Sequence, residues 1–73
     1  MPTWLEELIK MTYRFSVQND EWKRVRIAIS PKELEEYKAY MKESRPPPFI
    51  YAIRGFPLVV EEEPKVPPFK ADL

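Results

Sequence analysis

Two neighbouring segments of the chain alternate between apolar and polar residues, and together they predict a β-hairpin. In the first, residues 11–17, every second position is apolar: Met11, Tyr13, Phe15 and Val17. A polar turn at residues 18–21 separates it from residues 22–29, whose inward positions are Val25, Ile27 and Ile29. Because such alternation is typical of strands with one buried face, we expect the two segments to pair.

Helical spacing and capping residues predict two helices. Near the start, Thr3 and Glu6 fit a capping box, and an apolar stripe from Trp4 to Ile9 predicts a helix of about two turns. The second signal is Ser30-Pro31-Lys32-Glu33, with an N-cap, a proline at the first helical position and a capping box. We expect this helix to bury a face of Leu34, Tyr37 and Met41 and to end near Ser44, ahead of three consecutive prolines.

A second hairpin is predicted further along the chain. Residues 49–53 are uncharged and β-rich, as is typical of a central strand, and Gly55 fits a tight reversal that needs positive φ. Residues 58–60 form the returning strand, and Pro57 at its start favours an edge position. From Glu61 onward the chain is acidic and rich in proline, which predicts a loosely ordered tail.

The expected fold class is therefore α+β, with a small antiparallel sheet of two hairpins and one helix packed on it. A short N-terminal helix precedes this unit, and a disordered C-terminal tail follows it. Residues 1–60 make the single predicted domain, and residues 61–73 make the acidic tail. We expect a monomer.

The amino-acid composition limits the kinds of catalytic and metal site that the chain can form. The 73 residues include neither cysteine nor histidine, which argues against disulfides, a structural zinc site and most nucleophile or general-base designs. The glutamate clusters lie on a solvated helix and in the tail, so we expect no enzymatic activity and no cofactor. Acidic residues near the start do not fit a signal peptide, and no apolar run is long enough to span a membrane, so we expect a cytoplasmic protein.

The candidate binding residues come from the polar face of the first hairpin. Alternation places Arg14, Arg24 and Arg26 on that face, with Trp22 at its edge. Three arginines side by side repel one another modestly, which favours a partner that neutralises them. A solvated face shielded by Asp20 and Glu21 explains the same pattern. Trp22 is open to both interpretations, either as part of the core or as an interface anchor.

Two further segments and two classes of partner stay open. The N-terminal apolar stripe either packs within the domain or docks on a partner, and the tail either solubilises the chain or carries a linear motif. The arginines suit an acidic protein surface or the phosphates of a nucleic acid. A formal net charge of zero argues against nucleic acid, whose binding depends on accumulated positive charge.

In length and make-up, this cysteine-free and histidine-free chain with two predicted hairpins around one capped helix resembles a family of small phage proteins. These are phage-encoded transcription regulators of the Xanthomonas phage type that bind the host RNA polymerase. The resemblance implies inhibition of initiation at host promoters and antitermination, through contact with the β′ subunit. It implies no particular site residues. The expected function is thus a non-enzymatic regulator that binds bacterial RNA polymerase in the host cytoplasm.

Overall fold

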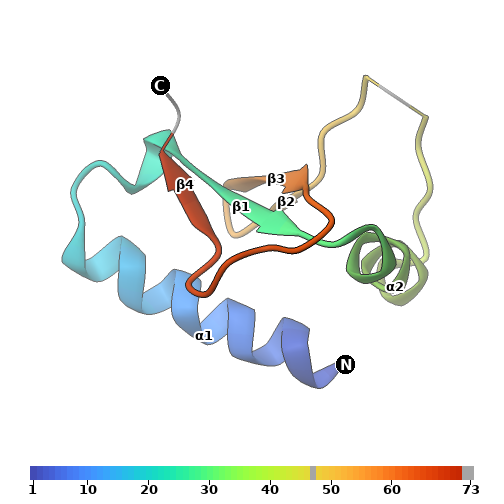
Figure 1. The fold of residues 1–73 in the computed structure, drawn as a ribbon, viewed down its shortest axis with the longest axis horizontal. Coiled ribbons are helices and arrows are strands. Elements are labelled where there is room, and N and C mark those ends of the chain that lie inside the picture. The colour runs from blue at the N-terminus through green and yellow to red at the C-terminus, as the bar shows by residue number, and fades with distance from the viewer. Residues whose placement is uncertain (47, 72–73) are drawn as a thin grey trace.

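The computed structural model describes residues 1–46 and 48–71 as two helices and a four-stranded mixed sheet (Figure 1). The elements are α1 (Thr3–Gln18), a 3-10 turn η1 (Trp22–Arg24), β1 (Val25–Ile29), α2 (Pro31–Met41), β2 (Ala52–Ile53), β3 (Phe56–Val60) and β4 (Phe69–Ala71). Figure 1 shows α1 along one side of the sheet and α2 at one end of it. The expected α+β class is confirmed, but the sheet is not built from two hairpins.

The predicted first hairpin is wrong, because residues 11–17 continue α1 instead of forming a strand. No glycine or proline interrupts residues 3–18, and Leu5, Leu8, Thr12 and Phe15 lie on one helical stripe against the core. Tyr13 and Val17, which the alternation had placed inside, are exposed. The helix also begins differently, since Pro2 is its N-cap and no side chain caps it.

The sheet order is β2-β3-β1-β4, which reverses the expected central and edge strands. β3 lies inside the sheet and pairs with β1 in parallel, with Ile27 opposite Leu58. β2 is a two-residue edge strand. Pro57 does not force β3 to the edge, because the registered pairs with β1 begin one residue after it.

The capping box of α2 is confirmed. Ser30 Oγ accepts a hydrogen bond from Glu33 N–H at 3.1 Å, and the Glu33 carboxylate accepts one from Ser30 N–H at 2.9 Å. The helix ends slightly earlier than expected, at Met41, because Lys42 adopts the left-handed conformation at φ 54°. Tyr37 is buried, whereas Met41 is exposed.

The predicted reversal at Gly55 is also confirmed. Arg54 and Gly55 both have positive φ, 50° and 87°, and they form the two-residue loop between β2 and β3. A Cβ at Gly55 would lie 3.4 Å from the Trp22 ring, which is ordinary van der Waals contact, so the positive φ and not a lack of space favours glycine here.

The expectation of a loosely ordered tail is corrected for residues 61–71, because β4 pairs antiparallel with β1. Ala28 N–H donates to Pro68 O at 2.8 Å, and the Phe69 ring stacks on Phe15 at 4.5 Å between centroids. The part of the chain described here includes no helix that is both long and apolar enough to cross a membrane.

Candidate protein-binding groove

Tyr51 organises the region between α2 and the β2–β3 hairpin. Its ring is buried and meets Tyr37 of α2 edge-to-face at 6.2 Å between centroids. Its hydroxyl accepts a hydrogen bond from the backbone N–H of Arg45 at 2.7 Å. Tyr37 in turn donates its hydroxyl proton to Ala52 O at 3.0 Å. These contacts hold Tyr51 against α2 and join Arg45 to it.

The connection carries a second set of stacked side chains on its outer part. Phe49 packs edge-to-face on Tyr51 at 4.8 Å between centroids, and the Arg45 guanidinium lies 4.7 Å from the centre of the Phe49 ring. Phe49 N–H donates a hydrogen bond to Pro46 O at 3.2 Å. In Figure 1 the connection rises away from the sheet before it returns to β2.

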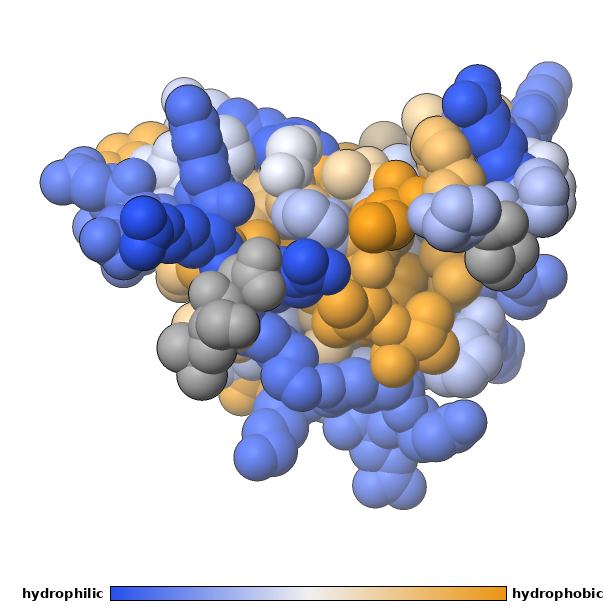
Figure 2. Space-filling model, turned by 90° about the horizontal axis from the view of Figure 1, so that it is seen from above, coloured by the Kyte–Doolittle hydropathy of each residue, from blue (hydrophilic) through white to orange (hydrophobic). Residues whose placement is uncertain are grey.

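A groove of about 180 Å³ lies between this connection, α2 and β3. Most of its lining is apolar: Leu34, Phe49, Ile50, Tyr51, Leu58 and Val60. Three of these residues face solvent, with exposed fractions of 41% for Phe49, 57% for Ile50 and 51% for Val60. Figure 2 shows a broad apolar area on this side of the molecule with charged side chains around it. Exposed apolar side chains that gather around a groove make this area the candidate binding surface.

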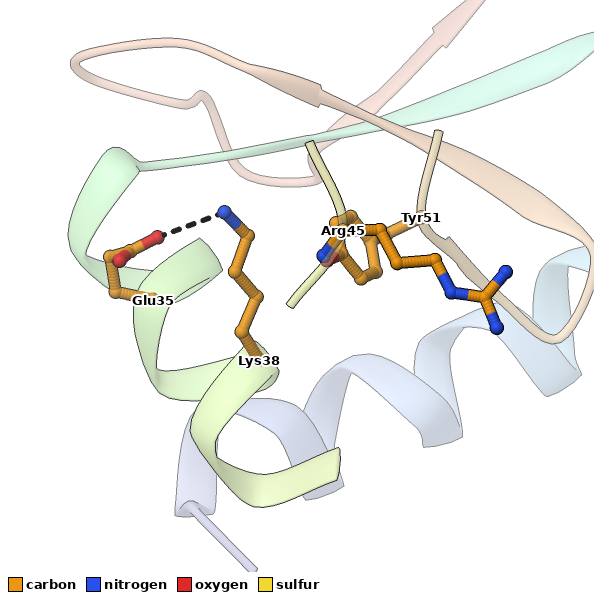
Figure 3. Close-up of polar contacts among 4 residues, drawn as sticks. All are labelled: Glu35, Lys38, Arg45 and Tyr51. Carbon is orange, nitrogen blue, oxygen red and sulfur yellow. Dashed lines mark hydrogen bonds and ion pairs between the residues drawn. The ribbon is translucent and has the colours of Figure 1, made fainter. Parts of the chain in front are cut away.

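Both charged residues that line the groove are cations, Lys38 and Arg45. Lys38 Nζ lies 3.2 Å from a carboxylate oxygen of Glu35 and 5.6 Å from the centre of the Tyr51 ring. Arg45 Nε lies 2.7 Å from a carboxylate oxygen of Glu43. Figure 3 shows Lys38 reaching from α2 towards Glu35, while the Arg45 guanidinium extends to the other side. The groove therefore combines apolar walls with two cations, each of which is paired with a glutamate outside the lining.

The buried phenol of Tyr37 lies beside Tyr51, and its pKa is shifted. Burial raises the pKa of Tyr37 above its ordinary value of 10.0, and the negative charge of Glu43 raises this pKa further. The phenol is thus held neutral, which suits its role as a hydrogen-bond donor to Ala52. We assign it a structural role, because its proton bridges α2 to β2.

The predicted binding residues lie on three different elements and not on one sheet face. Arg14 is exposed on α1, Arg24 is exposed in η1, and Arg26 is half-buried on β1. Trp22 is half-buried in η1, where its ring meets Phe56 at 5.2 Å between centroids. The shared-face geometry from which the four residues were selected is therefore absent, because Arg14 lies on a helix. Their role in binding a partner stays a prediction.

Arg26 does have a cationic neighbour that the sequence pattern did not indicate. Residue 26 is directly opposite Lys70 in the β1–β4 ladder, and Lys70 forms an ion pair with Glu61. Arg24 is separate from this pair in η1. Two positive residues on adjacent strands thus replace the predicted cluster of three.

The groove residues were not among the sequence-based candidates. A signal was present, since three prolines precede an apolar run from Phe49 to Ile53 that is too long for the two residues of β2. The residues of an apolar run that precede its strand have no place in the sheet, so their side chains stay exposed unless another element covers them. Phe49 and Ile50 are the exposed large side chains of this run.

Among the residues with a described structure, no group of three or more acidic side chains is arranged to hold a metal ion. Comparison with known proteins gives no match: no family model, no curated protein and no solved structure is similar to this chain.

Proposed function

We propose that this chain is a non-enzymatic regulator that binds a segment of a larger protein in the groove beside Tyr51. The observation that carries the proposal is the cluster of exposed apolar side chains, Phe49, Ile50 and Val60, next to Arg45. Aromatic residues and arginine are enriched in protein interfaces, and a few such residues supply most of the binding energy. Leaving this cluster in water is unfavourable, so its burial against a partner would stabilise a complex.

Bacterial RNA polymerase is the partner that we propose. The support is the resemblance in size and make-up to phage-encoded regulators of that enzyme, which act in the host cytoplasm. By this proposal the protein inhibits initiation and promotes antitermination by occupying a site on the polymerase, without chemistry of its own. The groove supplies a surface on which such a contact can form.

A direct binding measurement with purified bacterial RNA polymerase tests both parts. Replacing Ile50 with Ser removes an apolar side chain from the groove, and Val17→Ser is the matched control on the exposed face of α1. We expect Ile50→Ser to weaken binding by about tenfold, the loss typical of a central interface residue, and Val17→Ser to leave it unchanged. Equal effects of the two variants would overturn the groove. Absence of binding by the unaltered protein would overturn the polymerase as partner.

The arginines are tested in the same assay. We expect the double variant Arg24→Glu, Arg26→Glu to weaken partner capture without unfolding the protein, and unchanged capture would remove these residues from the interface. A salt titration identifies the alternative function of nucleic-acid binding. Phosphate contacts lose affinity log-linearly with salt concentration, whereas an interface with an apolar centre changes less.

A further inference from the structure

Successive residues of β3 direct their backbone N–H and C=O groups to opposite sides of the strand. Glu61 N–H donates to Ile29 O of β1 at 2.9 Å, and Leu58 N–H donates to Tyr51 O on the opposite side at 2.8 Å. Because hydrogen-bonding directions alternate from residue to residue in a strand, Val60 faces the same way as Leu58. The N–H and C=O of Val60 therefore point away from β1, towards the outer edge of β3.

The neighbouring strand ends before it reaches Val60. The β2–β3 register comprises Ile53 with Phe56 and Ala52 with Pro57, followed by the Leu58–Tyr51 hydrogen bond. A regular hairpin would next pair Phe49 with Val60, but Phe49 N–H donates to Pro46 O instead. In the described part of the chain, no backbone hydrogen bond joins Val60 to residues 45–51. A short open edge thus lies beside the apolar groove.

We infer that the partner segment binds in an extended conformation, as a short strand added to β3 at Val60. The inference rests on the proposed function and specifies its binding mode. Strand addition combines backbone hydrogen bonds with pockets for every second side chain. Val60 supplies the backbone groups, and the apolar walls of the groove receive the alternate side chains. Such an open edge is the feature that natural sheets otherwise cover or protect.

The charged residues that line the groove indicate the composition of the segment that binds there. Lys38 and Arg45 line it, and their carboxylate partners, Glu35 and Glu43, are not part of the lining. A segment with an acidic residue beside its apolar positions complements this arrangement. The occupant is accordingly an extended stretch of a larger protein with alternating apolar residues and a carboxylate. A helical segment would leave the edge of Val60 unused, because its own backbone groups are already paired.

Selection of short random peptides displayed against the intact protein identifies a probe of defined sequence. We expect selected peptides to alternate apolar and polar residues and to carry an acidic residue. Selection of peptides with apolar residues at helical spacing, or of none, would overturn the strand mode. Self-association of the protein that Val60→Pro abolishes would overturn the partner class, because the edge would then serve a second copy of the chain.

Hydrogen exchange of the unaltered protein with a selected peptide tests the backbone contact directly. The Val60 amide proton is expected to exchange at least about tenfold more slowly in the complex than in the free protein. The Val59 amide, which faces β1, should be protected in both states and is the internal control. An unchanged exchange rate at Val60 in a saturated complex would show that the peptide binds without adding a strand.

Two variants separate this inference from the proposed function. Val60→Pro removes the outward N–H, whereas Val60→Thr keeps it and preserves the branched shape. Stronger loss of peptide binding in Val60→Pro supports strand addition, and equal binding of the two variants opposes it. If Ile50→Ser weakens binding while the Val60 pair behaves alike, the groove is used without strand pairing. If none of the three weakens binding, the groove itself is wrong.

A peptide series covers the case in which Val60→Pro fails to fold. N-methylation of successive peptide amides removes one donor at a time while the protein stays unaltered. Strand addition predicts that methylation weakens binding by about tenfold at alternate positions, since alternate amides face β3. Loss at every position, or at none, would contradict it.

Discussion

Two aromatic clusters lie along the β2–β3 hairpin, and one is closed whereas the other is open. Phe56 is fully buried, and its ring meets those of Phe15, Trp22 and Phe69 at 6.1, 5.2 and 5.8 Å between centroids. Tyr51 instead meets Tyr37 and Phe49, and the second of these is exposed.

The difference lies in where the neighbours come from. The rings around Phe56 belong to α1, η1 and β4, so elements that are distant in the sequence meet there. The neighbours of Tyr51 come from α2 and the adjacent 42–51 connection, and its outer part stays open to solvent. Similar side chains thus serve stability at the closed site and, by our proposal, binding at the open one. We expect mutations to separate the two roles.

The largest effect is expected from Phe56→Ala. Removing a fully buried ring leaves a cavity and costs about 3–5 kcal/mol of unfolding free energy, a large share of the total for a domain of this size. Urea denaturation followed by tryptophan fluorescence measures the loss, and Phe49→Ala is the matched control from the open cluster. A similar loss in both variants would remove the distinction between the clusters.

The next largest loss of stability is expected where β4 packs on the Phe56 cluster. Phe69→Ala removes the stack on Phe15 and should destabilise the protein by about 1–2 kcal/mol. The same denaturation experiment measures it, and Val66→Ala is the control, because Val66 is almost wholly exposed in the segment that leads to β4. Unchanged stability of Phe69→Ala would mean that residues 61–71 do not form part of the folded unit.

Local signals explain which parts of the fold were predictable. The start of α2 depends on Ser30, Pro31 and Glu33, which interact within one turn, and the reversal at Gly55 depends on backbone freedom at a single residue. Residues 11–17 carry no such signal, because Met11 and Phe15 fit both a strand and a helix period. In the helix, Phe15 contacts Phe56 and Phe69. These partners are distant in the sequence, so no local pattern reveals them.

The site was less predictable than the fold. The prolines indicated where α2 ends. They did not indicate that Phe49 would leave the ladder opposite Val60, because its contacts with Arg45 and Tyr51 form only in three dimensions. The arginines were selected by assuming one strand face, an assumption that failed once Arg14 proved helical.

A smaller effect is expected where the open cluster is attached to the core. Tyr37→Phe removes the hydrogen bond to Ala52 O and should cost about 1 kcal/mol at neutral pH. Because the pKa of Tyr37 is raised in the folded state, its contribution is complete below pH 10 and is lost as pH rises through the raised pKa. Denaturation curves at neutral and alkaline pH should therefore show the stabilities of the two proteins converging. A constant difference would contradict the raised pKa.

The smallest effect is expected at Ile50, which lines the groove next to the open cluster. Ile50 is more than half exposed, so Ile50→Ser should change the unfolding free energy by no more than about 0.5 kcal/mol. The same variant is expected to weaken partner binding by about tenfold. Normal stability with weakened binding would show that this apolar side chain serves recognition and not folding. A loss of stability comparable to that of Phe69→Ala would instead make the groove a part of the core, and the contrast between the two clusters would disappear.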